Sequence, residues 1–184
     1  MTPGTVDAVV IGGGVVGLCA ATALARKGVS VTLVSENRAG QASPAAAGML
    51  APSVERAAGA AHDFAIAARD FYPEFLERLA DESGIRVPLN RLGILQVALT
   101  EAGVKGLRKA AAPGSDWLEK RELATMEPTL AHALGAVMNP DDGAVDNVVL
   151  ISALEELLPR TGRITRLEGD AVKVERHESS WRVE

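Results

Sequence analysis

The sequence has little of several features that would point to particular classes of protein. Its single cysteine, Cys19, cannot form an internal disulfide, which favours a reducing compartment. Its three histidines have no ligand spacing to one another or to Cys19, so no metal site is expected. No apolar run approaches the length needed to cross a bilayer, so no membrane span is expected. The 19 basic residues form no dense block and the net charge is −5, which argues against a nucleic-acid partner.

The N-terminal segment, MTPGTVDAVV, lacks a cationic stretch followed by a long apolar core. No secretory signal peptide is therefore expected, and the protein is expected to be cytoplasmic. A hydrophobic fraction of 47% with 23% charged residues is typical of a folded globular protein. The length of 184 residues allows one domain and part of a second.

The first 36 residues predict a strand–helix–strand unit. An apolar, largely β-branched run at Val6–Ile11 predicts a buried parallel strand, and Val29–Val34 predicts a second one. Between them, the alanine- and leucine-rich segment Val15–Lys27 predicts a helix that ends at Gly28. Such a βαβ unit has a right-handed crossover.

Three glycines with dinucleotide-binding spacing lie between the first strand and this helix. We expect Gly12 to permit a tight turn, Gly14 to let the backbone approach a pyrophosphate, and Gly17 to let helix and strand pack closely. The helix N-terminus then offers N–H groups and a positive dipole to the phosphates. The pattern predicts that a dinucleotide binds here.

The residue that would bind the ribose hydroxyls can be assigned in two ways. The fingerprint calls for an acid about 20 residues further on. Counting the alternation along the second strand places Ser35 there, with Glu36 one step later. Either Glu36 reaches the ribose after a slight strand distortion, or Ser35 makes a neutral hydrogen bond.

Further along the chain, periodicity and turn signals predict alternating helices and strands. We expect a bent strand or strand pair over 87–99, a strand end at Trp117, and a strand with a short return around the turn Pro140–Gly143. Asp146 is a predicted N-cap. Helices are predicted at Asp63–Ser83, Glu101–Ala111, Lys120–Met126 and Asn147–Leu158, and a hairpin is predicted at the C-terminal end, turning at His177–Ser180.

The run SPAAAGMLAP at Ser43–Pro52, taken with the glycine fingerprint, resembles the FAD-dependent amino-acid oxidases of the D-amino-acid-oxidase type. Within that family it is most similar to the glycine oxidases of thiamine biosynthesis. An alternative interpretation of the alanine run is the start of a helix packed in a core. The resemblance implies an α/β fold, with a Rossmann-like FAD-binding βαβ domain and part of an antiparallel substrate-domain sheet.

The resemblance also implies a division of the chain and a set of cofactor contacts. Residues 1–84 would form the FAD-binding core with its flavin-contacting loop and the following helix. Residues 85–145 would form part of the substrate domain, and 146–184 would return to the FAD-binding domain. The implied FAD contacts, together with the fingerprint glycines, are Gly12, Gly14, Val15, Val16, Gly17, Ser35, Glu36, Ala42, Ser43, Ala47, Gly48, Met49 and Ala171.

The implied activity is oxidation of glycine, sarcosine or a small D-amino acid, with O2 reduced to H2O2. Family members are roughly twice as long as this sequence, and the arginine and tyrosine that hold their substrate lie in the second half. No catalytic residue can therefore be assigned here. Two alternatives stay open: a silent FAD-binding fragment that needs a separate C-terminal half, and an NAD-dependent dehydrogenase, in which AAAGMLAP would have no obvious role. A homo-oligomer is also possible.

Overall fold

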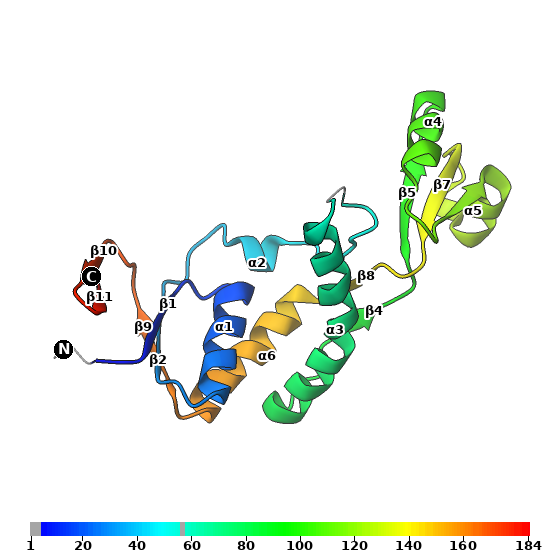
Figure 1. Cartoon of the computed structure of the whole chain (residues 1–184). Coiled ribbons are helices and arrows are strands. Elements are labelled where there is room, and N and C mark those ends of the chain that lie inside the picture. The colour runs from blue at the N-terminus through cyan, green and yellow to red at the C-terminus, as the bar shows by residue number, and fades with distance from the viewer. Residues whose placement is uncertain (1–4, 56–57) are drawn as a thin grey trace. The chain divides into compact units, whose positions relative to one another are not determined.

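A computed structural model describes residues 5–55 and 58–184 of the chain, which divide into two compact units (Figure 1). The first unit contains the residues up to Ala47, together with Leu76–Val87 and Asp146–Glu184. The second contains Gly48–Phe75 and Pro88–Val145.

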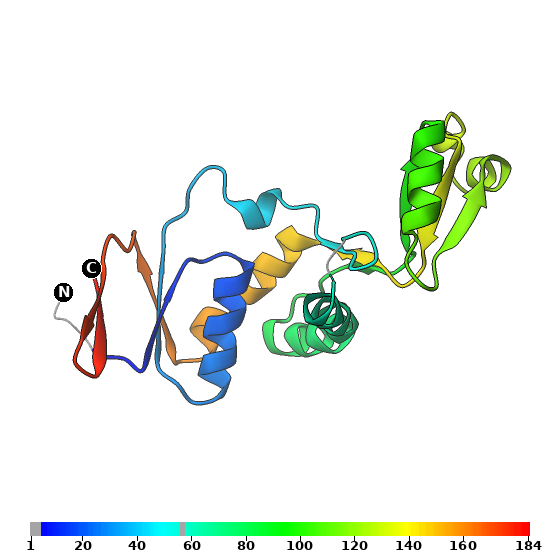
Figure 2. The ribbon, with the colours of Figure 1, turned by 45° about the horizontal axis from the view of Figure 1, so that its top comes forward.

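The first unit is built on a parallel three-stranded sheet in the order β1-β2-β9. Its strands are β1 (Ala8–Ile11), β2 (Val31–Ser35) and β9 (Ile164–Glu168). Helices α1 (Val15–Arg26) and α6 (Asn147–Arg160) pack against one face of this sheet (Figures 1 and 2). The core between helices and sheet consists of small and branched apolar side chains, among them Leu18, Ala21, Leu33, Ala153 and Leu154. The predicted βαβ unit is therefore confirmed.

The ends of these elements follow the predicted local chemistry. Gly28 has φ +86°, a left-handed conformation that glycine adopts without a steric penalty, directly after the end of α1. The Asp146 carboxylate accepts a hydrogen bond from the Val149 N–H at 2.9 Å, which confirms the predicted N-cap of α6. The C-terminal hairpin is also confirmed, as β10 (Val174–His177) pairs antiparallel with β11 (Ser180–Val183).

The second unit contains two antiparallel three-stranded sheets. One has the order β3-β8-β4, with β3 (Met49–Leu50), β8 (Gly143–Val145) and β4 (Leu89–Asn90). The other has the order β5-β7-β6, with β5 (Ile94–Ala98), β7 (Gly135–Asn139) and β6 (Asp116–Glu119).

Helices α4 (Glu101–Ala110) and α5 (Lys120–Met126) pack against the β5-β7-β6 sheet, and a 3-10 turn, η1 (Pro128–Leu130), follows α5. Leu123 of α5 is fully buried and forms a core with two fully buried alanines, Ala133 and Ala136. The long helix α3 (Ala60–Ser83) contributes its first part to the second unit and its last part to the first. The predicted helices at these positions are confirmed.

Two expectations about strand pairing are wrong, and one strand was not predicted. The return after the Pro140–Gly143 turn does not pair with the strand before it, because β8 pairs with β3 and β4 while β7 pairs with β5 and β6. Likewise, β4 and β5 belong to different sheets rather than to one strand pair. Strand β9, with the sequence ITRLE, was not predicted, because its alternating polar residues carry no continuous apolar run.

Candidate functional site: a pocket at the ends of three parallel strands

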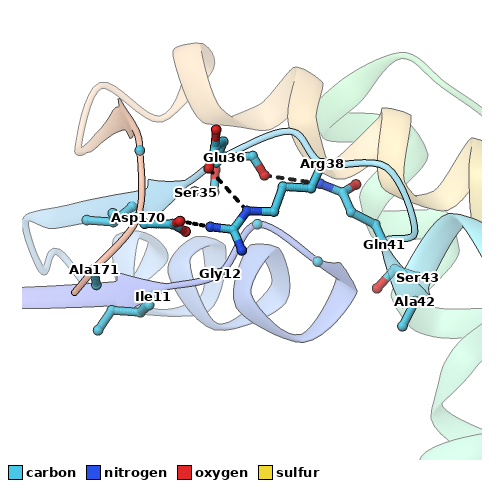
Figure 3. A pocket seen from close by; sticks show the side chains of 14 residues that line it. Ile11, Gly12, Ser35, Glu36, Arg38, Gln41, Ala42, Ser43, Asp170 and Ala171 are labelled. Atoms are coloured by element: carbon cyan, nitrogen blue, oxygen red, sulfur yellow. Dashed lines mark hydrogen bonds and ion pairs between the residues drawn. The ribbon is translucent and has the colours of Figure 1, made fainter. Parts of the chain in front are cut away.

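A pocket of about 330 Å³ opens in the first unit where β1, β2 and β9 end (Figure 3). The carboxyl ends of parallel strands are the usual place for a ligand in an open α/β sheet. The residues that line the pocket come from the turn after β1, the exit of β2, the short helix α2 (Ala42–Ala45) and the segment after β9. They are Ile11, Gly12, Gly13, Gly14, Val34, Ser35, Glu36, Arg38, Gln41, Ala42, Ser43, Gly169, Asp170 and Ala171.

The glycine turn has the steric properties that the fingerprint predicts. Gly12 has φ +105°, which a residue with a side chain rarely adopts. A Cβ on Gly17 would clash with the carbonyl oxygen of Gly12, so helix and turn are in direct backbone contact. A Cβ on Gly14 would lie 2.9 Å from the Ser43 hydroxyl, so the close approach of Ser43 to this turn requires a residue without a side chain.

The N-terminus of α1 lies at the pocket, which its N-cap residue Gly14 lines. Its N-cap residue, Gly14, has no side chain to accept the first N–H groups of the helix. The Val15 N–H instead donates to the Ser43 hydroxyl at 3.1 Å, and Ser43 is held in turn through its carbonyl, which accepts from the Asn147 side chain at 2.5 Å. A helix N-terminus at a pocket carries the positive end of the helix dipole, which favours an anion such as a phosphate.

The two candidate ribose residues occupy different environments. Ser35 is 6% exposed, and its hydroxyl has no hydrogen-bond partner in the described part of the chain. A Cβ on Gly13 would meet this side chain at 2.8 Å, so Gly13 is required for the close approach of the turn to β2. Glu36 is exposed and presents a carboxylate at the pocket. A buried hydroxyl without a partner and a free carboxylate oxygen both suit a polyhydroxylated ligand.

The segment that resembles the flavin-contacting loop continues from the first unit into the second. Ala42–Ala45 form α2, so this part of the alanine run is a helix, but none of its residues is buried in a core. Ala47 ends the first unit, and Gly48 and Met49 begin the second. There Gly48 adopts φ +67° and its carbonyl accepts from the Val145 N–H at 2.9 Å. Met49 pairs with Ala144 in the β3-β8 ladder and has a 53% exposed side chain.

A buried ionic cluster anchors the chain just after this segment, within the second unit. The fully buried Asp142 carboxylate accepts hydrogen bonds from the Ser53 N–H at 3.2 Å, from its hydroxyl at 3.1 Å and from Arg69 at 3.2 Å. Burial acts to lower the pKa of Arg69, but its hydrogen bonds to Asp70 and Asp142 outweigh burial and raise that pKa above its ordinary value. The Asp-Asp-Gly turn is thus a structural junction, and no cluster of three or more metal-ligating side chains occurs among the described residues.

Comparison with known proteins gives a consistent assignment. Residues 7–184 match the model of the DAO family, described as FAD dependent oxidoreductases. This chain belongs to that family. It is 36% identical over 162 residues to the bifunctional protein ThiO/ThiG of a Synechocystis species, covering 86% of this chain and 24% of that protein. It is 34% identical over 151 residues to the glycine oxidase of Bacillus licheniformis, covering 80% of this chain and 41% of that enzyme.

The crystal structure of glycine oxidase from Geobacillus kaustophilus superposes with a TM-score of 0.89 at 26% identity, covering 97% of this chain and 50% of that chain. The fold of this chain therefore matches half of a glycine oxidase, an α/β fold with a parallel βαβ sheet and antiparallel sheets. It spans half or less of the length of each of these relatives.

The pocket of this family member brings together some of the predicted site residues and not others. Those that line it are Gly12, Gly14, Ser35, Glu36, Ala42, Ser43 and Ala171. Val15 starts α1 beside it, Val16 is 80% exposed, and Gly17 packs behind the turn. Ala47 does not line the pocket, and Gly48 and Met49 belong to the second unit.

Several pocket residues were not predicted from the sequence. Gly13 was hidden inside a run of three glycines, although the need for close contact with β2 is a steric signal of the same kind as at Gly17. Gly169 and Asp170 could not be found without knowing that β9 lies beside β2, whereas Gln41 stands directly before the predicted Ala42. Arg38 stands near the ribose position in the sequence, but only its two ion pairs distinguish it from a solvated loop arginine.

Proposed function

We propose that this chain binds FAD, with the adenosine diphosphate part of the cofactor in the pocket of the first unit. The proposal is carried by one observation: the glycine turn at the N-terminus of α1 lines the same pocket as the buried, unpartnered hydroxyl of Ser35. Phosphates would lie against Gly12, Gly14 and the first turn of α1. This fit depends only on residues of the first unit.

We assign the remaining predicted residues to successive parts of the cofactor, from the adenosine end to the flavin. Ser35 and Glu36 would bind the ribose hydroxyls, and the backbone of Ala171 would meet the adenine. Val15 and Val16 would lie along the pyrophosphate, with Ala42 and Ser43 further in. Ala47, Gly48 and Met49 would contact the flavin, where small residues let backbone N–H groups reach the polar edge of a flat ring.

We further propose that the complete catalytic unit oxidises glycine, sarcosine or a small D-amino acid, in thiamine biosynthesis. FAD would supply the redox chemistry, accepting two electrons and a proton from the substrate amine and passing electrons to O2 to give H2O2. The protein must orient the substrate and exclude water, and none of the described residues can be assigned to that task. The support is the family membership and the identity of 29–36% to named glycine oxidases and ThiO/ThiG proteins.

Purification in excess FAD, followed by a coupled H2O2 assay with glycine, sarcosine and D-alanine, tests this proposal. Flavin absorbance that co-elutes with the chain, together with H2O2 formed only in the presence of an amino acid, is the expected result for a complete oxidase. NADH binding without FAD binding would instead support a nicotinamide-dependent dehydrogenase and contradict the assignment.

A second candidate function is supported by the extent of the matches. The chain covers 41% of the Bacillus licheniformis glycine oxidase and 50% of the solved Geobacillus kaustophilus chain. It would then bind FAD but oxidise amino acids only beside a polypeptide that corresponds to the other half. Co-elution of flavin without H2O2, and H2O2 formation after that polypeptide is added, would favour this function. No gain on addition would argue against it.

A further inference from the structure

One arginine side chain links two carboxylates at the nucleotide pocket. Arg38 Nε donates to Glu36 at 3.1 Å, and the other side of its guanidinium pairs with Asp170. Figure 3 shows the guanidinium between the two acids, next to Gly12. All three charged residues line the pocket. Because Glu36 follows β2 and Asp170 follows β9, the arginine joins the exits of two neighbouring strands.

This ion-pair cluster, Glu36–Arg38–Asp170, is not needed to hold the two strands together. β2 and β9 already pair along five residues each, and the Gly169 N–H donates to the Ser35 carbonyl at 3.3 Å. The side chains of the cluster are 46–54% exposed, and ion pairs at such positions contribute little to folding stability. A role in stability therefore does not account for their convergence on the pocket.

The cluster does determine the charge that an anionic ligand meets. Two carboxylates and one guanidinium leave a single net negative charge at the pocket. Without the guanidinium, both carboxylates would stand uncompensated beside a ligand that carries two phosphates, and like charges repel over this distance. The bond to Arg38 uses one oxygen of Glu36, so the other oxygen and the remaining lone pairs stay available to ribose hydroxyls.

We propose that Arg38 is a positioning residue for the adenosine diphosphate part of the cofactor. It holds the Glu36 carboxylate in place and cancels the repulsion that Glu36 and Asp170 would exert on the pyrophosphate. Asp170 holds the guanidinium over the pocket. This inference rests on the proposed FAD site and adds to it two residues, Arg38 and Asp170, at the adenosine end.

The test compares Arg38→Ala with a double variant that also removes the Asp170 charge. ADP is the probe, because it reports on this end of the pocket without the flavin, and FAD is the second ligand. At about 20 mM salt, Arg38→Ala is expected to weaken binding of both ligands about fivefold. The double variant Arg38→Ala/Asp170→Asn is expected to recover to within about twofold of the wild type, because one of the two repelling charges is gone. At about 150 mM salt the defect of Arg38→Ala shrinks.

The matched control is Arg160→Ala. Arg160 is likewise exposed and paired with a glutamate, Glu156, but it lies at the C-terminal end of α6 and does not line the pocket. It is expected to leave ADP and FAD binding unchanged. Circular dichroism checks that every variant is folded.

The outcomes separate this inference from the proposed function. If the folded wild-type chain binds neither ADP nor FAD, the cofactor site itself is wrong and the role of Arg38 falls with it. If the wild type binds both and Arg38→Ala binds them equally well, only the role of Arg38 is overturned. A loss in Arg38→Ala that Asp170→Asn does not reduce would show that Arg38 acts by packing rather than by charge, and would also overturn it.

Discussion

At the scale of single residues, Asp142 shows how a buried charge can be tolerated. A carboxylate removed from water is costly unless hydrogen bonds and an opposite charge compensate it. Ser53 supplies two hydrogen bonds and Arg69 supplies the charge, and the side chain of Arg69 is itself only 11% exposed. The network fixes the chain that follows β3, so it shapes the segment that we propose to contact the flavin.

Replacement of Asp142 by asparagine is expected to destabilise the protein by about 3 kcal/mol, because the buried guanidinium of Arg69 loses its buried partner. Chemical denaturation followed by circular dichroism measures this. The matched control is Asp70→Asn, since Asp70 also pairs with Arg69 but is 52% exposed, and it is expected to cost less than about 1 kcal/mol. Equal effects of the two substitutions would show that burial is not what makes Asp142 important.

Asp7 predicts a pH dependence in the first unit. Hydrogen bonds from the backbone N–H and the hydroxyl of Ser30, at 2.8 and 2.7 Å, lower the pKa of the Asp7 carboxyl below its ordinary value. A carboxyl with a lowered pKa in the folded state contributes stability above its ordinary pKa, near 3.8, and loses it as pH falls through the lowered value. Asp7→Asn should therefore lower Tm at pH 7, and the difference in Tm between the variant and the wild type should become smaller below about pH 4. A difference in Tm that does not change with pH would contradict this account.

At the scale of elements, local sequence signals predicted most helix boundaries but did not predict which strands pair with one another. Helix α5 and the start of α6 were found to the residue, because glycine, proline and N-cap signals act on their immediate neighbours. Which strands pair was not predictable for β8, since a short apolar strand can join any available edge. β9 was missed because its short sequence, ITRLE, has no continuous apolar run, and its place beside β2 is set by tertiary contacts.

The cap of α6 gives a prediction at this scale. Asp146→Ala removes the acceptor for the Val149 N–H and is expected to cost about 1 kcal/mol of stability. Asp141→Ala is the matched control, because Asp141 is an exposed aspartate in the preceding turn. Thermal denaturation of the two variants compares them. If Asp141→Ala is as damaging as Asp146→Ala, the loss is not due to the cap.

At the scale of the whole molecule, the described chain leaves apolar surface on its parallel sheet. α1 and α6 cover one face, while on the other Val9 is 39% and Ile11 51% exposed. Ile11, Val34 and Leu167 lie in register across the three strands on this face. An apolar sheet face beside an edge strand is prone to association. No helix among the described residues is long and apolar enough to cross a membrane.

We therefore expect the isolated chain to self-associate, and Val9→Lys to weaken that association about tenfold or more. Burying a valine contributes roughly 1.5 kcal/mol, and a lysine in its place adds a desolvation cost. Sedimentation or light scattering over a concentration series measures the effect. Val172→Lys makes the same change at a valine that is 83% exposed outside the sheet, and it should have little effect. A monomer at all concentrations would refute this expectation.

In the candidate site, as in the secondary structure, local sequence patterns predicted some residues and could not predict others. The glycine turn was predicted because its constraints are steric and lie within six residues. The ion-pair cluster Glu36–Arg38–Asp170 was not, because Asp170 follows β9, more than 100 residues away from β2 in the sequence. Ser35 and Glu36 could not be separated by counting, because a side chain's burial is decided by what packs on it. In the structure, Ser35 is buried against Gly13 and Glu36 is exposed.

The most direct test of the central claim is a titration of the purified chain with FAD, followed by flavin fluorescence, in the wild type and in Gly14→Ala. Gly14 has φ −77°, which any residue adopts, so an added methyl group acts through what it meets, the Ser43 hydroxyl at 2.9 Å that lines the pocket and accepts from the Val15 N–H. Gly106→Ala, with open space around it, is the control. We predict saturable one-to-one binding to the wild type and to the control, and binding to Gly14→Ala weakened about tenfold or more. A folded wild-type chain without saturable binding, or a Gly14→Ala variant that binds FAD as well as the wild type, would contradict the account.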